Sequence, residues 1–279
     1  MRNGTSPHRD DPPFRAISRS GWGIVAIGLI AIAVLTLPTV ALIERTIETR
    51  PSLADENTRR TLVDALRLSL VTSAIALGII VTIGTPVAWM LARYRLPAHR
   101  LLDALIDLPI VLPPAVAGVA LLSAFGRQGL LGDQLNALGI SVGFTTAAVV
   151  IAQLFVGAPF YIRTARTGFA RLDRGLEEAA ADLGASPARV FWRVVLPMAR
   201  SSLAAGAVLA WARALGEFGA TIMFAGNRQG VTQTMPLAIY ERFQAGDLPT
   251  ALLLSVVLLA GSAVLLVVVR LLGESGTPR

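Results

Sequence analysis

Two ionisable residues, Arg213 and Glu217, lie inside an apolar segment where few other side chains could do chemistry. A spacing of four residues puts both on one face of a helix, where an ion pair can form. Charged groups are costly in hydrocarbon, so such residues normally face the interior of a helix bundle and pair. The residues alone allow two interpretations: a structural ion pair that stabilises the bundle, or a part of a translocation path or its gate.

The rest of the composition argues against covalent and metal chemistry. The chain has no Cys, which excludes disulfides, thiolate catalysis and Cys-bound metals. Its two His residues, His8 and His99, fall in a tail and a loop, so neither a His-rich metal site nor a His proton relay is expected. The sequence also lacks the GxxxxGK[ST] phosphate-binding loop, so ATP would have to be hydrolysed by a separate subunit. We expect no enzyme activity and no directly bound cofactor.

These residues must be positioned by a strongly apolar chain, with 54% hydrophobic and only 15% charged residues among 279. The apolar residues cluster into runs of about 20, the length needed to cross roughly 30 Å of hydrocarbon. We therefore expect an all-α polytopic membrane protein with six transmembrane helices. Their approximate bounds are 23–42, 66–91, 102–125, 145–162, 202–225 and 250–272. The third is interrupted by Pro109, Pro113 and Pro114, which predict a packing kink or a bent, gate-lining span.

The distribution of Arg predicts the orientation. With the N-terminus inside, the inner segments hold 16 Arg residues and the outer loops hold 7. This bias favours both termini in the cytoplasm. The formal charge of +7 is spread over loops, which suggests orientation in the lipid bilayer rather than nucleic-acid binding.

A mildly polar segment, 172–199, then lies on the cytoplasmic side between the fourth and fifth spans. It predicts two short helices. The first begins at Asp173, and Gly184 suits the left-handed conformation at its end. Ser186 can cap the second helix with Pro187 at its first position, and Pro197 is expected to close it before the fifth span. The segment is either an ordinary amphipathic loop or a docking surface for a partner.

The spacing within this segment resembles the signature cytoplasmic loop of ABC importer permeases. The pattern is Glu-Ala-Ala, three residues, Gly, nine residues, then an aliphatic residue, any residue, and Leu-Pro. It is carried by Glu178, Ala179, Ala180, Gly184, Val194, Leu196 and Pro197, with Val194 where Ile is common. In that family the loop forms a coupling helix that sits in a cleft of the ATPase subunit.

Two further segments resemble the molybdate permeases of the ABC class, a branch related to the sulfate permeases. One is ARALGEFGATIMFAGNRQGVTQTMPLAIY at 212–240, and the other is LPIVLPPAVAGVALLSAFGRQGLLG at 108–132. The resemblance covers about 61–272. With the ion pair and the kink, it makes five residues candidates for the pore or gate: Arg213, Glu217, Thr221, Pro113 and Pro114. For an oxyanion, Arg213 is the better contact, because Glu217 would repel it.

The resemblance implies a type I ABC importer permease in a bacterial cytoplasmic membrane. Its expected partners are a second permease copy in a homodimer, two cytoplasmic ATPase subunits and an external oxyanion-binding protein. The expected organisation is a disordered cytoplasmic tail at 1–20, a first span with its periplasmic loop at 21–60, the permease domain at 61–272 and a cytoplasmic tail at 273–279.

Several alternatives stay open at this point. The cargo could be sulfate, thiosulfate or tungstate instead of molybdate. A secondary transporter would be expected to show internal repeats and carboxylates on several spans, whereas Asp107 and Glu217 are almost alone. An intramembrane enzyme would need a metal set or a nucleophile–base pair, and neither is apparent.

Overall fold

The computed structural model describes residues 19–51, 55–94 and 97–274, without some side chains near the ends of α1 and α12. Most of the predicted N-terminal tail (1–18) and of the C-terminal tail (275–279) lies outside the described residues. α1 begins at Arg19, within the tail predicted for 1–20, and α12 continues to Glu274, within the tail predicted for 273–279.

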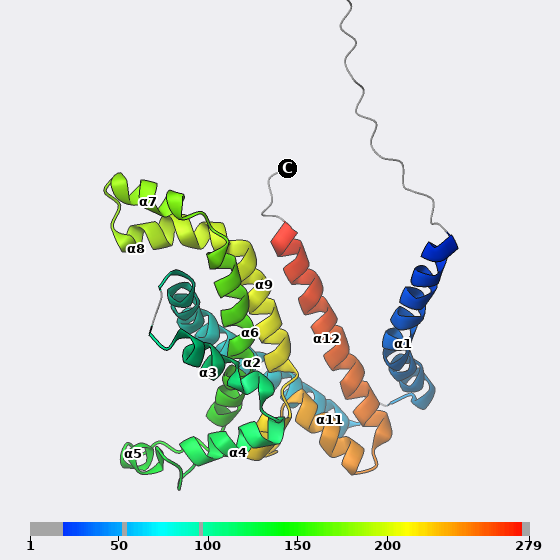
Figure 1. Ribbon diagram of the computed structural model, residues 1–279. Helices are drawn as coiled ribbons and strands as arrows, with labels where there is room; N and C mark the ends of the chain where they lie inside the picture. Colours follow the sequence, from blue (N-terminus) through cyan, green and yellow to red (C-terminus); the bar gives the residue numbers. More distant parts are fainter. Residues whose placement is uncertain (1–18, 52–54, 95–96, 275–279) are drawn as a thin grey trace, which may run out of the picture. The chain divides into compact units, whose positions relative to one another are not determined.

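The described chain is helical, and no strand occurs in these ranges (Figure 1). The helices are α1 (Arg19–Thr49), α2 (Glu56–Arg93), α3 (His99–Val111), α4 (Pro114–Phe125), α5 (Gly132–Ala137), α6 (Thr146–Ala170), α7 (Arg174–Asp182), α8 (Pro187–Val190), the π-helix η1 (Phe191–Val195), α9 (Leu196–Leu215), α10 (Gly219–Ala225), α11 (Met235–Gln244) and α12 (Leu248–Glu274).

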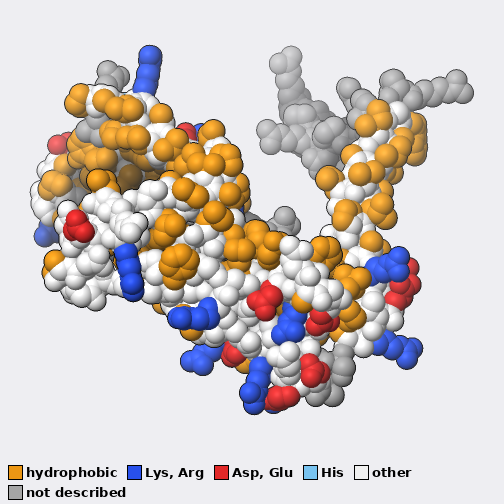
Figure 2. All heavy atoms as spheres, turned by 90° about the horizontal axis from the view of Figure 1, so that it is seen from below, with side chains coloured by type: hydrophobic (Ala, Val, Ile, Leu, Met, Phe, Trp, Pro, Cys, Tyr) orange, Lys and Arg blue, Asp and Glu red, His pale blue; other side chains and the backbone are white. Residues whose placement is uncertain are grey.

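The chain divides into two units, Met1–Glu48 and Thr49–Arg279. Nearly the whole of α1 belongs to the first unit, and α2 to α12 form the second. Large apolar side chains of α1 are exposed, for example Ile27 at 70% and Leu35 at 77%. On the face seen in Figure 2, hydrophobic side chains cover continuous areas and charged ones gather apart from them. Such surfaces are unfavourable in water and suit a lipid environment.

Each of the six predicted spans corresponds to a helix or a pair of helices. Four segments are long and apolar enough to cross a membrane: Val25–Thr49, Glu56–Arg93, Thr146–Ala170 and Pro187–Leu215. The pair α3 and α4 passes the same test as one broken span. The sixth predicted span falls within α12, whose apolar stretch Leu248–Val264 is shorter than the other candidate spans.

The third span is not one continuous helix over 102–125. It bends by 116° between α3 and α4. Pro113 precedes α4 and Pro114 is its first residue, so neither interrupts a ladder of hydrogen bonds. Pro109 lies within α3 and does not end it. The sharp bend therefore arises at the Pro-Pro pair.

The prediction for the fifth span was wrong at both ends. Pro197 does not close the preceding helix, because α8, η1 and α9 form one helix over Pro187–Leu215. A Pro inside a helix clashes with the carbonyl four residues earlier. The wider π turn of η1, placed just before Pro197, accommodates it. At the other end the helix stops at Leu215, and Gly219–Ala225 forms the separate helix α10.

The core of the second unit lies between α2, α6 and α9, which pack along one another. Small residues allow this close approach: a Cβ on Gly157 of α6 would lie 3.0 Å from the carbonyl oxygen of Ala210 on α9. Tyr161 is fully buried at the centre, and its hydroxyl lies 2.6 Å from that of Thr85 on α2. These three helices form the frame that carries both regions considered below.

At the start of α2, Asp55 provides the helix cap. Its carboxylate accepts hydrogen bonds from the backbone N–H and the hydroxyl of Thr58, both at 2.8 Å. The backbone bond, followed by the hydroxyl bond, holds the pKa of Asp55 below its ordinary value. The cap stabilises the first turn of the span.

Candidate functional site

The charged pair lies where the fifth span breaks. α9 ends at Leu215, and Glu217 lies in the short gap before α10. Its side chain is 1% exposed, and Oε1 accepts a hydrogen bond of 2.7 Å from the N–H of Ala220. This carboxylate therefore satisfies a free amide at the start of α10, a role that the spacing of charges does not reveal.

The ion pair that the spacing predicts is present. Arg213 Nη2 lies 2.7 Å from Glu217 Oε2, although the contact lacks the alignment of a hydrogen bond. The Arg213 side chain is 32% exposed, so part of its guanidinium remains open beside a buried carboxylate. The pair neutralises a charge that would be costly inside the bundle.

The two broken spans meet at this point. A Cβ on Gly219 would lie 2.3 Å from the Cβ of Pro114, and one on Gly118 would lie 2.6 Å from the Cβ of Met223. α4 and α10 are therefore in backbone-close contact, which only Gly permits at these two positions. Pro114 and Gly219 together place the bend of the third span against the break of the fifth.

Thr221 of α10 is fully buried, and its hydroxyl has no partner among the described residues. Gln153 of α6 is also fully buried, and neither the nitrogen nor the oxygen of its amide has a hydrogen-bond partner among the described residues. Sequence reasoning selected Thr221 but missed Gln153. A lone amide within an apolar run was the available signal, since buried polar groups are costly unless paired.

The polar loop, 172–199, forms the two helices predicted for it. The carboxylate of Asp173 accepts from the N–H of Gly175 at 2.9 Å and caps α7. Gly184 has φ +82° after α7. Ser186 caps α8 by accepting from the N–H of Arg189 at 3.4 Å, with Pro187 first in the helix. Each of these local signals has the conformation expected from residue type.

Most residues of the Glu-Ala-Ala pattern face outward. Glu178, Ala179, Gly184 and Pro197 are exposed, whereas Ala180, Val194 and Leu196 are half-buried. Two large apolar side chains that the sequence did not single out are also exposed, Leu183 at 89% and Trp192 at 65%. Exposed apolar residues beside small ones leave a surface suited to a partner protein.

The polar loop is attached to the second span by residues that sequence reasoning missed. Arg93, at the end of α2, is only 8% exposed and pairs with Glu177 of α7. It also donates to the carbonyl of Leu172 at 3.3 Å. The ring of Trp89 lies 5.1 Å from that of Phe191, measured between centroids. The sequence identifies Arg93 only as one of the Arg residues that predict the orientation of the chain.

A second ionic cluster joins α3 to α6. Arg163 lies 2.7 Å from Asp107, and Arg166 lies 2.5 Å from Asp103. Asp107 is thus partnered and partly exposed, rather than an isolated carboxylate of a proton path. These pairs tie the bent third span to the central helix.

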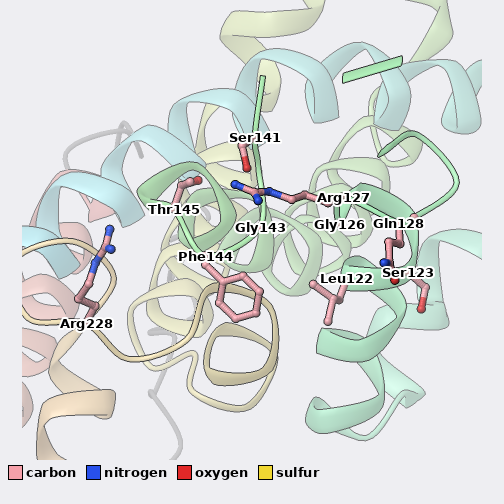
Figure 3. A pocket seen from close by; sticks show the side chains of 11 residues that line it. Leu122, Ser123, Gly126, Arg127, Gln128, Ser141, Gly143, Phe144, Thr145 and Arg228 are labelled. Carbon is pink, nitrogen blue, oxygen red and sulfur yellow. The ribbon is translucent and has the colours of Figure 1, made fainter. Parts of the chain in front are cut away.

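At the end of the second unit opposite α7 and α8 lies an open pocket of about 790 Å³ (Figures 1 and 3). It is formed by the turn after α4, by the segment before α6 and by the loop after α10. Its lining residues are Leu122, Ser123, Gly126, Arg127, Gln128, Gly129, Ser141, Gly143, Phe144, Thr145 and Arg228. Two of these are cationic and none is acidic.

Comparison with known sequences identifies relatives over most of the chain. The profile of the family described as "Binding-protein-dependent transport system inner membrane component" matches residues 84–275. The molybdenum transport system permease protein ModB of Mycobacterium tuberculosis is 50% identical over 202 residues, 72% of this chain and 76% of that protein. The sulfate transport system permease protein CysT of Escherichia coli is 41% identical over 204 residues, 73% and 74% of the two chains.

Solved structures support the same architecture. A bacterial ABC transporter involved in the import of alginate matches with a TM-score of 0.69 at 16% identity, over 92% of this chain and 96% of that one. The MetNI methionine ABC transporter, in an inward facing conformation, matches with a TM-score of 0.63 at 19% identity, over 80% and 100%. At such identities the likeness concerns the fold, which is that of type I ABC importer permeases, as the sequence predicts.

Proposed function

The chain belongs to the family of binding-protein-dependent transport system inner membrane components, and on this basis we propose that it is the membrane-spanning subunit of an ATP-driven importer of molybdate. It is an integral membrane protein. The assignment of molybdate as the cargo rests on the 50% identity to molybdenum permeases over 202 residues. Identity to sulfate permeases is lower, 41% over 204 residues for the Escherichia coli protein.

In the proposed importer, two copies of this chain line one pore, two ATPase subunits bind below, and a soluble oxyanion-binding protein docks above. Both termini are cytoplasmic in a bacterial inner membrane. ATP closes the ATPase dimer and moves the polar loops together, which opens the pore outward. Hydrolysis then returns it inward. The permease itself forms no covalent intermediate and binds no cofactor.

The polar loop is the proposed binding surface for the ATPase subunit. Its exposed face combines small residues, Ala179 and Gly184, with Leu183, which is 89% exposed. Arg93 holds α7 to α2 through Glu177. Movement of α7 would therefore act directly on the second span.

A second route leads from the polar loop to the charged pair. α8, η1 and α9 form one helix, Pro187–Leu215, which starts in the loop and ends just beyond Arg213. Arg213, Glu217, Thr221, Pro113 and Pro114 are the proposed gate region, because both span breaks meet there.

The cargo is tested by uptake of labelled molybdate into proteoliposomes that contain the complete complex and the binding protein. We expect ATP-dependent uptake that unlabelled molybdate and tungstate inhibit at lower concentrations than sulfate. Stronger inhibition by sulfate would assign the chain to the sulfate branch. ATP-independent uptake driven by an ion gradient would contradict the whole proposal.

The ATPase binding surface is tested separately with Glu178→Lys. We expect this variant to remain in the membrane at normal levels but to retain less ATPase during purification and to lose most uptake. Glu44→Lys, an exposed charge reversal on α1, is the matched control and should retain both. Normal ATPase binding and normal uptake by Glu178→Lys would show that the polar loop does not form the contact with the ATPase subunit.

A further inference from the structure

The pocket at the end opposite the polar loop contains two arginines that form no ion pair with any carboxylate of the described residues. Arg127 follows α4 and Arg228 follows α10, and both guanidinium groups are exposed. In Figure 3 the Arg127 side chain extends toward Ser141 and Thr145, while Arg228 lies beyond Phe144. Elements distant in the sequence thus bring two positive charges to one hollow.

Three other outer arginines of the described chain are neutralised by nearby carboxylates. Arg59 and Arg60 both pair with Glu56, at 2.5 and 2.7 Å. Arg242 lies 3.7 Å from Asp247 and donates to Thr61 at 2.7 Å. Arg127 and Arg228 form no ion pair with any carboxylate that the structure describes, and both line this one pocket.

The two carboxylates that border the loop containing Arg228 accept hydrogen bonds from side-chain amides. Asp64 accepts from Gln229 at 3.3 Å, and Glu241 accepts from Asn227 at 2.8 Å and Gln233 at 2.5 Å. Neither forms an ion pair with Arg228 within the described ranges. Neither carboxylate lines the pocket, whose two charged lining residues are both cationic.

Neutral donors complete the lining. The hydroxyls of Ser123 and Ser141 and the amide of Gln128 border the pocket, together with the apolar side chains of Leu122 and Phe144. Guanidinium groups bind oxyanions through charge-assisted hydrogen bonds, and hydroxyls can bind further oxygens of the same ion. A volume of about 790 Å³ is far larger than one such ion, so the ion would bind with part of its water shell.

We propose that this pocket is an outer anion site, in which Arg127 and Arg228 hold a partly hydrated tetrahedral oxyanion dianion before it enters the membrane path. The inference rests on the proposed import function and adds to it a binding site for the ion on this chain itself. Because both arginines are exposed, water screens the attraction and binding is weak. Weak binding suits a site that passes an ion on, and the positive field also increases the rate of anion arrival.

The absence of Cys from the chain allows a direct test. Ser141→Cys introduces one thiol inside the pocket, and Gln244→Cys introduces one outside it, at the exposed last residue of α11. Membranes containing the full complex are treated with an anionic or a cationic methanethiosulfonate, and labelling of the permease band is timed. A positive pocket should raise the anionic-to-cationic rate ratio at Ser141→Cys about threefold or more over that at Gln244→Cys.

Two manipulations then test the site. Adding Arg127→Gln and Arg228→Gln should bring the ratio at Ser141→Cys close to the control value, whereas Lys at both positions should retain most of it. Sodium molybdate or sulfate at millimolar concentration should slow anionic labelling at Ser141→Cys more than sodium chloride of equal ionic strength does. The chloride control removes general screening by salt.

Equal ratios at the two cysteines, or a ratio unaffected by the Gln variants, would overturn the proposal. Protection by the external binding protein but not by molybdate or sulfate would overturn it too, and would make the arginines contacts for acidic side chains of that protein. The labelling does not depend on transport. A complex that fails to import any oxyanion would therefore contradict the proposed function without deciding this measurement.

Discussion

The polar loop and the region where the two broken spans meet are built in opposite ways. The loop is exposed, and Asp173, Gly184 and Ser186 each act on their nearest neighbours in the chain. In the span-break region, Glu217 is buried and Gly219 has its conformation fixed by contact with Pro114, about a hundred residues away. The exposed polar loop takes its helix ends from local signals, whereas the break between α9 and α10 depends on the elements packed around it.

The largest effect is expected from Arg213→Ala. It leaves the carboxylate of Glu217 buried without its cation, which should destabilise the protein by about 3 kcal/mol. Arg60→Ala is the matched control, since Arg60 and Glu56 are also four residues apart and 2.7 Å from each other, but exposed. Its cost should be below about 1 kcal/mol.

Thermal unfolding in detergent, followed by the loss of monodisperse protein, measures both variants. Similar midpoints for Arg213→Ala and Arg60→Ala would mean that the buried pair is no more important than a surface pair. The contrast between the two regions would then lose its electrostatic basis.

A smaller loss is expected from Gly219→Ala. The added methyl would lie 2.3 Å from the Cβ of Pro114, a rigid ring that cannot rotate away, so α4 and α10 must separate. Overpacking of this kind costs roughly 1–3 kcal/mol. Gly78→Ala in α2 places its methyl where nothing lies within 4 Å and should be neutral or slightly stabilising. The same unfolding assay compares them, and equal midpoints would show that α4 and α10 are not in close contact.

The smallest effect is expected in the polar loop, from Gly184→Ala. The left-handed backbone of Gly184, at φ +82°, should make this change cost about 1 kcal/mol, confined to the end of α7. Gly175→Ala is the control, because its methyl meets Asp173 at an ordinary distance of 3.4 Å. Trypsin cleavage at the loop arginines should accelerate severalfold in Gly184→Ala alone, with the unfolding midpoint of the bundle unchanged. A fall in the unfolding midpoint as large as that of Gly219→Ala would show that the polar loop, like the span-break region, depends on the packing of the whole bundle.

Much of the fold could be predicted, because hydrophobic run length and local caps are properties of short segments. The first helix of the polar loop began and ended close to the expected residues, and the second began where expected but continued to Leu215. The fate of Pro197 could not be predicted, because a π turn relieves the clash that would otherwise end the helix. The bend of 116° at Pro113 and Pro114 was foreseen as a kink, but its size depends on α10 lying against α4.

The candidate residues divide in the same way. The spacing of Arg213 and Glu217 was enough to predict their ion pair, since a helix brings residues four apart together. Glu217 as the partner of the Ala220 amide required the break before α10. Arg93 and Glu177 are 84 residues apart, and only the packing of α2 beside the polar loop brings them together.

The sequence by itself determined the membrane class, the helix signals of the polar loop and the ion pair, because each follows from the residue types within one segment. Tertiary structure alone decided which breaks meet, which distant carboxylates pair with Arg93 and Arg163, and which arginines face a pocket. Arg59, Arg60 and Arg242 lie within five residues of the carboxylates that neutralise them, so their ion pairs are local. The partners of Arg93 and Arg163 lie 84 and 56 residues away, and only the folded chain brings them close, because an ion pair depends on distance in space.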